Sequence, residues 1–186
     1  MLTSGELAAA FQTYWDDAEK CRAAGAYWSL LHVTVCIPDI CSALQAIDGE
    51  TKRKSYVKWC NRWFGNPKLN GAERYRMRCK LLHQGRASRD KRGRYAGFSF
   101  GQPSEGGIVE HMRLERRALH VDVGELLRET KEAVGRWAEW LEANPRTRKA
   151  RNAEKHLKYL VTIKPTVITA FGPTGIVRFE TVNKTS

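Results

Sequence analysis

A long apolar segment near the start of the chain constrains the fold more than any other feature. Residues 26–47 read AYWSLLHVTVCIPDICSALQAI and would be apolar on nearly every side of a helix. Such a helix has to be covered by other elements, so we expect it at the centre of the fold, with a kink at Pro38. Asp39 then places a carboxylate inside an apolar helix. It either finds a polar partner there, or faces solvent or caps the turn after Pro38.

Helical and strand periodicity on both sides predicts the elements that surround this segment. They are helices at 5–25, 52–65, 74–84, 124–144 and 146–160, a strand or hairpin at 109–123, and a β-hairpin at 166–182. We expect Ser4 to cap the first helix. The fold class is therefore mainly α, an antiparallel bundle of four or five helices with a small C-terminal β-hairpin. Residues 1–144 form the bundle with a basic loop at 86–107, and residues 145–186 add the last helix and the hairpin to the same domain.

Size, hydropathy and cysteine content restrict the class of protein. A chain of 186 residues can bury one good core. A mean hydropathy of -0.52, with no long unbroken apolar run and no signal-peptide pattern at the N-terminus, predicts a cytoplasmic protein without a membrane span. Five cysteines without paired spacing fit a reducing compartment. The sequence has no metal-ligand spacing, Walker loop or dinucleotide fingerprint, so we expect no metal and no cofactor.

Positive charge is concentrated in the middle of the chain. The net charge is +12, and residues 51–100 carry fifteen Lys or Arg against two Asp or Glu. Residues 1–50 carry two against seven, and residues 101–186 carry fifteen against eleven. A local positive field attracts polyanions, and nucleic-acid backbones are the commonest large polyanions in a cytoplasm. The alternative is a solvated basic face that only aids solubility.

The most basic helix ends in a histidine. Residues 74–85 read RYRMRCKLLHQG, with His83 in the last turn before Gly85. Arg76 lies seven residues before His83 on nearly the same face, and Arg78 lies five before it, about 140° round the helix. Arginine can bind a phosphate through two donors, and histidine exchanges protons near neutral pH, so the pair suits metal-free RNA cleavage by the 2′-hydroxyl. The alternative is a histidine that only caps helix carbonyls.

This helix resembles the active-site helix of the HEPN superfamily, helical domains of which many are ribonucleases in toxin–antitoxin, phage-defence and CRISPR systems. The family signature is Arg, four to six intervening residues and then His, near the end of a bundle helix; RCKLLH from Arg78 to His83 matches it. TVCIPDICSAL and VDVGELLRETKEAVGRW extend the resemblance over roughly residues 5–143. It implies that Arg78 and His83 are catalytic, and that two copies pair so that their motif helices build one composite site.

The signature alone does not choose between positions in this chain. Four pairs match it: Arg76 with His83, Arg78 with His83, Arg113 with His120, and Arg151 with His156. Only the first two lie on a helix inside the basic middle third and end at a glycine. We therefore place the site at Arg78 and His83, where Asp39 would orient either side chain.

Other residues are expected to support the site or to bind RNA. The supporting residues are Asp39, Arg76 and Gln84, and the RNA-binding residues are Lys80, Arg86, Arg89, Lys91, Arg92 and Arg94. The sequence thus predicts a metal-independent endoribonuclease that cleaves single-stranded RNA in a toxin or phage-defence role. The alternative is a non-catalytic module of the same fold that binds nucleic acid or a protein. A third hypothesis is a toxin silenced by an antitoxin or another acidic regulatory partner.

Overall fold

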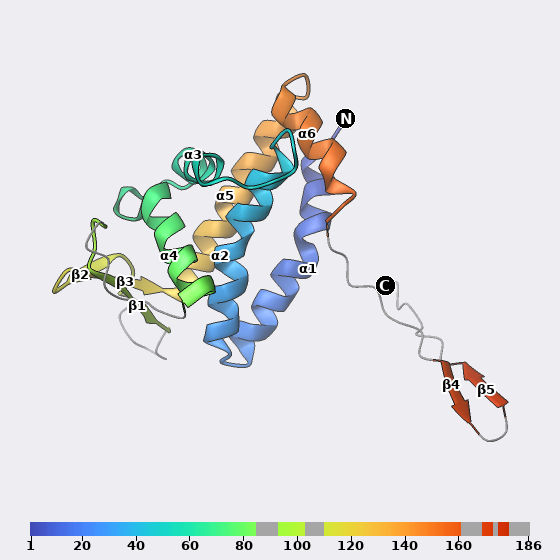
Figure 1. Cartoon of the computed structure of the whole chain (residues 1–186), viewed down its shortest axis with the longest axis horizontal. Coiled ribbons are helices and arrows are strands. Elements are labelled where there is room, and N and C mark those ends of the chain that lie inside the picture. Colours follow the sequence, from blue (N-terminus) through green and yellow to red (C-terminus); the bar gives the residue numbers. More distant parts are fainter. Residues whose placement is uncertain (85–92, 103–109, 161–168, 173–174, 179–186) are drawn as a thin grey trace.

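The structure is a computed structural model, and it describes residues 1–84, 93–102, 110–160, 169–172 and 175–178. Six α-helices, a short 3-10 turn and two small sheets make up this part of the chain (Figure 1). The helices are α1 (Ser4–Ala23), α2 (Tyr27–Leu44), α3 (Arg53–Trp63), α4 (Gly71–Gln84), α5 (Val123–Ala143) and α6 (Arg148–Leu157), and the turn is η1 (Pro67–Leu69). The strands are β1 (Gly97–Gly101), β2 (Arg113–Glu115), β3 (Ala118–Asp122), β4 (Thr169–Gly172) and β5 (Gly175–Arg178). The mainly helical class expected from the sequence is confirmed.

Helix α2 lies at the centre, as its apolar sequence predicts. It packs against α1, α3, α4, α5 and α6, and α1 and α4 run in the opposite direction to α2 (Figure 1). Among the described residues, α2 is the one helix with the length and composition that crossing a membrane requires, and half of that stretch is buried inside the molecule. The hydropathy pattern did not lead us to expect such a helix. Because α2 packs against five other helices, its apolar side chains are explained as part of the hydrophobic core.

The first turn of α4 is fixed tightly against α3. Gly71 donates its backbone N–H to the Asn61 side chain at 2.6 Å, and the Asn70 side chain accepts from the next two backbone N–H groups of α4. A Cβ atom at Gly71 would lie 2.4 Å from the Val57 carbonyl oxygen, so only glycine permits this approach. The N-cap of α1, by contrast, is Thr3 and not the predicted Ser4, because Thr3 and Glu6 form a reciprocal capping box.

The larger sheet corrects one prediction. Its order is β1-β3-β2, with β1 parallel and β2 antiparallel to β3. The predicted loop at 86–107 is therefore wrong at Gly97–Gly101, which pairs with a strand about twenty residues later. The predicted hairpin at 109–123 is confirmed as β2 and β3, and the antiparallel pairing of β4 with β5 confirms the C-terminal hairpin.

A buried ionic network joins α4, α5 and the residues just before β2. Arg74 is 2% exposed, and its Nη2 donates to Glu129 Oε2 at 2.6 Å while its guanidinium lies 3.5 Å from the Phe64 ring centroid. Asn66 Nδ2 and His111 Nε2 approach the other carboxylate oxygen at 3.2 and 3.3 Å. Burial opposes the charge of Glu129, but His111, Arg74 and Asn66 outweigh it and hold the pKa of Glu129 at about 2. This network stabilises the fold when Glu129 is ionised.

We predict that Glu129→Gln lowers the free energy of unfolding at pH 7 by about 3 kcal/mol, since the folded pKa is depressed from 4.5 to about 2. The stabilisation is present above the unfolded pKa and is lost as the pH falls through about 4.5 toward 2. Urea denaturation at pH 7 and pH 3 should therefore show a smaller difference from the wild type at pH 3. Glu139→Gln, exposed on the same helix, is the control and should change little. If Glu129→Gln lowered the free energy of unfolding equally at pH 7 and pH 3, the ionised carboxylate of Glu129 would not be the source of the stabilisation.

Candidate functional site

Arg78 and His83 are in direct contact within one chain. Arg78 Nη1 lies 3.1 Å from His83 Nε2, although the two residues are about 140° apart around α4. The long arginine side chain spans this offset. A guanidinium stays protonated and can only donate, so His83 Nε2 accepts and the imidazole carries its proton on Nδ1. His83 is exposed and Arg78 is half-buried, so the pair lies at an accessible end of the helix.

Asp39 of the central helix holds Arg78 in place. Arg78 Nε donates to Asp39 Oδ2 at 2.6 Å, and the Asp39 side chain is only 16% exposed. The structure thus decides between the two alternatives for this carboxylate, which faces Arg78 and not solvent. With Nε donating to Asp39, the terminal nitrogen Nη1 of Arg78 is the one that contacts His83.

The contact does not fully compensate for the burial of Asp39. Oδ1 is buried and has no hydrogen-bond partner among the described residues. Burial raises the pKa of Asp39, and the opposing effects of Arg78 and His83 are smaller. The carboxylate therefore positions Arg78 at a cost to the fold, unlike Glu129, whose hydrogen bonds exceed the cost of burial.

Three side chains that the sequence analysis did not select also lie beside Arg78. Arg78 Nη1 donates to Cys79 Sγ at 3.8 Å, and the interaction of the Tyr75 hydroxyl with Cys79 and then burial raise the pKa of Tyr75. Burial and the charge of Asp39 raise the pKa of Cys36, so this thiol stays protonated. Helical spacing in the sequence could have identified these side chains as neighbours of the site, because Cys36 precedes Asp39 by three residues and Tyr75 precedes Cys79 by four.

Two other predicted residues gather at the opposite end of α4. Arg76 Nη1 pairs with Glu73 Oε1 at 2.9 Å, which directs its guanidinium toward the first turn of the helix. Arg94 donates its backbone N–H to the same oxygen at 3.0 Å and a guanidinium N–H to the Pro67 carbonyl. Glu73 and His83 are ten residues apart, about 15 Å along the helix. Arg76 and Arg94 therefore do not join the Arg78–His83 pair through these contacts.

The remaining predicted residues are only partly covered by the structure. Lys80 is half-buried on α4. Gln84 is the last residue of α4, and its side chain lies outside the described residues, as do Arg86, Arg89, Lys91 and Arg92.

The other two matches to the arginine–histidine signature make different contacts. Arg113 and His120 are opposite each other on β2 and β3, but His120 Nε2 pairs with Glu115 at 3.3 Å. His156 Nδ1 lies 3.2 Å from the backbone carbonyl oxygen of Leu44. Within the described part of the chain, Arg78 with His83 is the one match in which guanidinium and imidazole touch.

The described residues contain no group of three or more His, Cys, Asp or Glu side chains that could hold a metal ion. No family model, curated protein or solved structure matches the chain. A function for this chain therefore has to come from the chemistry of its own side chains.

We predict that Asp39→Asn leaves the melting temperature at pH 7 unchanged or raises it. The reason is that a raised folded pKa adds stability only at low pH, and that contribution is lost as the pH rises through the folded pKa of Asp39. Differential scanning calorimetry of the wild type, Asp39→Asn and the exposed control Asp16→Asn measures the effect. A loss as large as that of Glu129→Gln would show instead that the Asp39–Arg78 pair stabilises the packing of α2 on α4.

Proposed function

We propose that this protein is a metal-independent endoribonuclease of HEPN type that cleaves single-stranded RNA. The observation that carries the proposal is the 3.1 Å contact between Arg78 Nη1 and His83 Nε2 at an exposed helix end, with Arg78 held from behind by Asp39. It is supported by the match of RCKLLH to the family signature and by the mainly helical fold. A toxin or phage-defence role is what that resemblance implies.

The reaction needs one base and one stabilised negative charge. When a phosphodiester binds, the terminal nitrogens of Arg78 donate to its non-bridging oxygens, and Nη1 leaves His83. His83 Nε2 then has a free lone pair and removes the proton of the adjacent 2′-hydroxyl. The 2′-oxygen bonds to phosphorus and the bond to the 5′-oxygen breaks, which leaves a 2′,3′-cyclic phosphate and a 5′-hydroxyl. The contact seen in the free protein is thus the resting form of the base.

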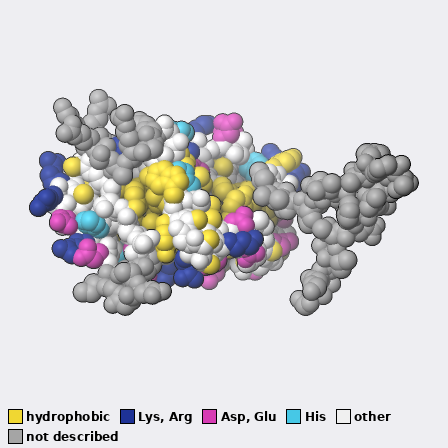
Figure 2. Space-filling view, turned by 90° about the horizontal axis from the view of Figure 1, so that it is seen from below, with side chains coloured by type: hydrophobic (Ala, Val, Ile, Leu, Met, Phe, Trp, Pro, Cys, Tyr) yellow, Lys and Arg dark blue, Asp and Glu magenta, His cyan; other side chains and the backbone are white. Residues whose placement is uncertain are grey.

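The leaving 5′-oxygen has to gain a proton, and a second histidine would provide it. We therefore also propose a homodimer in which His83 of the partner subunit faces the same phosphate. Helices α2 and α4 are antiparallel, so α4 ends beside the half of α2 that begins at Tyr27 (Figure 1). Hydrophobic side chains gather on the face below this end of the molecule (Figure 2), and Trp28 in the first turn of α2 is 58% exposed. An exposed apolar surface of this kind is typical of an interface.

A binding module without catalysis is the second candidate. The excess of cations over residues 51–100 favours it, because binding a polyanion needs positive charge and no proton transfer. An acidic antitoxin would be attracted by the same charges. Cleavage assays separate the two candidates, because a binding module retains RNA and releases no products.

We predict that the full chain cleaves unstructured RNA in EDTA and leaves 2′,3′-cyclic phosphate ends. His83→Ala should lower the rate at least about 100-fold, since it removes the base. Arg78→Lys should do so as well, because lysine keeps the charge but loses the forked donor and the contact through Nε. Asp39→Asn should lower the rate less, while the fold stays intact. End-labelled RNA on denaturing gels gives the rates.

His120→Ala is the matched control, since His120 belongs to a nominal arginine–histidine pair that does not touch. It should cleave as the wild type does. Full activity of His83→Ala, or activity that EDTA abolishes, would refute the proposed mechanism. RNA binding without any products would favour the binding module.

We predict a dimer in solution, with twice the chain mass of 21.2 kDa by size-exclusion chromatography with light scattering. Trp28→Glu should give monomers and lose cleavage, because the new charge would be buried in the interface. Tyr159→Glu, at a residue 70% exposed near the end of α6, should stay dimeric and active. A wild-type monomer that cleaves RNA would rule out the composite site. A Trp28→Glu dimer with full activity would place the interface elsewhere.

A further inference from the structure

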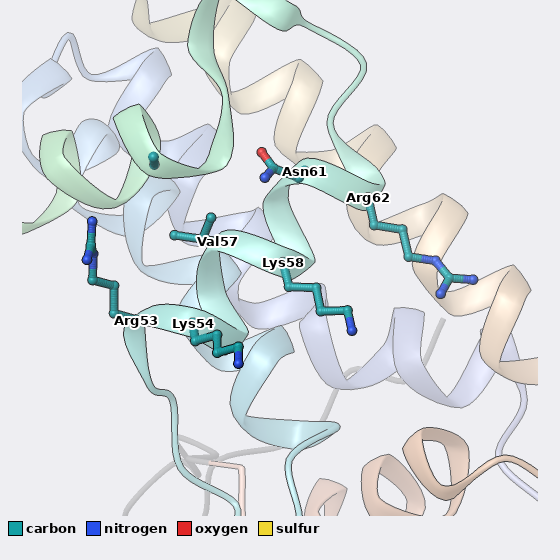
Figure 3. A pocket seen from close by; sticks show the side chains of 7 residues that line it. Arg53, Lys54, Val57, Lys58, Asn61 and Arg62 are labelled. Atoms are coloured by element: carbon teal, nitrogen blue, oxygen red, sulfur yellow. The ribbon is translucent and has the colours of Figure 1, made fainter. Parts of the chain in front are cut away.

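An open groove of about 900 Å³ runs along the outer side of α3, next to the first turn of α4 (Figure 3). We call it the α3 groove, and it is lined by Arg53, Lys54, Val57, Lys58, Asn61, Arg62 and Ala72. The sequence analysis placed this helix within the basic residues 51–100 but assigned the RNA contacts to residues 80–94. Four of the seven lining residues are cations and none is a carboxylate, which makes the groove a site for an anion.

Three of these cations form one row. Lys54, Lys58 and Arg62 are spaced by four residues, so their Cα atoms follow one side of α3 at steps of about 6 Å (Figure 3). Lys54 and Lys58 are exposed, and neither forms an ion pair with any described residue. A row of unneutralised cations matches a ligand whose negative charges repeat along a line.

Aromatic contacts fix one end of the row and add a further cation. The Arg62 guanidinium carbon lies 4.3 Å from the Trp140 ring centroid, and Lys149 Nζ of α6 lies 5.8 Å from the same ring. Burial and the charges of Arg62 and Lys58 lower the pKa of Lys149. Like charges held this close repel one another, and a bound anion would relieve the repulsion.

The floor of the groove suits bases more than a compact ion. Val57, Ala72 and the aliphatic parts of the basic side chains give it an apolar surface. Asn61 Oδ1 is used by the Gly71 N–H, which leaves its amide NH₂ for a polar atom of a ligand. A cationic groove that follows the phosphates is the usual arrangement for single-stranded nucleic acid, and here the bases would lie against the apolar floor.

A series of contacts joins the α3 groove to the Arg78–His83 pair. The Arg53 guanidinium carbon lies 5.9 Å from the Tyr75 ring centroid, and Tyr75 precedes Cys79 by about one turn of α4. Cys79 Sγ in turn accepts from Arg78 Nη1. A strand bound along α3 would therefore continue toward His83.

We propose that the α3 groove binds the backbone of single-stranded RNA and leads it to Arg78 and His83. The identity of the ligand rests on the proposed function, but binding itself requires no catalysis. An acidic protein segment, the other polyanion that could fit, lacks the bases that the apolar floor would contact.

The test uses the full chain with His83→Ala, so that RNA is bound and not cut. Fluorescence anisotropy measures the affinity for a labelled unstructured RNA at salt concentrations from about 50 to 200 mM. Lys54→Gln with Lys58→Gln should weaken binding at least about tenfold at the lowest salt. The slope of log affinity against log salt should fall by about 1.4, since two phosphate contacts are lost. Lys20→Gln with Arg22→Gln removes the same charge from exposed positions on α1 and should change neither quantity appreciably.

The outcomes for the groove and for the nuclease are separable. If the double variant in α3 binds RNA as tightly as the double variant in α1, RNA binding by the α3 groove is refuted. This holds even if the wild-type protein cleaves RNA. If the wild-type protein releases no products, and only the double variant in α3 loses RNA binding, the proposal for the α3 groove is supported. The proposed nuclease activity is then refuted. Displacement of RNA by poly-L-glutamate as readily as by unlabelled RNA of equal charge would show recognition of charge alone and overturn the assignment to nucleic acid.

Discussion

The packing of the apolar helix α2 among five other helices is the constraint on which the rest of the structure depends. Five helices cover it, and one of them, α4, has to meet the only carboxylate that α2 carries. Asp39 could not remain inside this layer without a donor, and Arg78 is that donor. The requirement that a buried charge be paired thus fixes the side chain of Arg78, and through it the position of the guanidinium beside His83.

Arg74 and Arg78 lie four residues apart on α4 and show how burial separates structure from function. Arg74 is almost fully buried, and its partner Glu129 is held ionised by three neighbours, with a pKa of about 2. The buried and paired guanidinium of Arg74 is therefore not accessible to a ligand. Arg78 is half-buried, and its partner Asp39 has a raised pKa and one oxygen without a hydrogen-bond partner among the described residues. Within this part of the chain, Arg78 Nη1 contacts an exposed imidazole and a thiol. An arginine held at one nitrogen and open at the others is suited to bind phosphate.

The sequence predicted what depends on local periodicity and missed what depends on distant partners. The central helix, the hairpin before α5 and the C-terminal hairpin follow from patterns within about twenty residues. Strand β1 was missed because its glycine-rich segment has no period and its parallel partner comes later in the chain. The Arg78–His83 pair was selected by context, with the two residues about 140° apart around the helix and a composite site in a dimer implied by the family resemblance. One extended arginine side chain closes that offset within a single chain, so a dimer has to be justified by the need for a second proton donor.

The positive charge of the middle third also divides differently in three dimensions than along the chain. Arg74 and Arg76 of α4 are paired with Glu129 and Glu73, so this helix presents less free charge than its sequence suggests. Lys54 and Lys58 of α3 have no such partners among the described residues, and they stand in one row. A count of charges by segment cannot separate the two cases, because the carboxylates that neutralise α4 include one from α5. Because the arginines of α4 are paired with carboxylates, the strongest candidate for a surface that binds a polyanion is α3 and not α4, which holds His83.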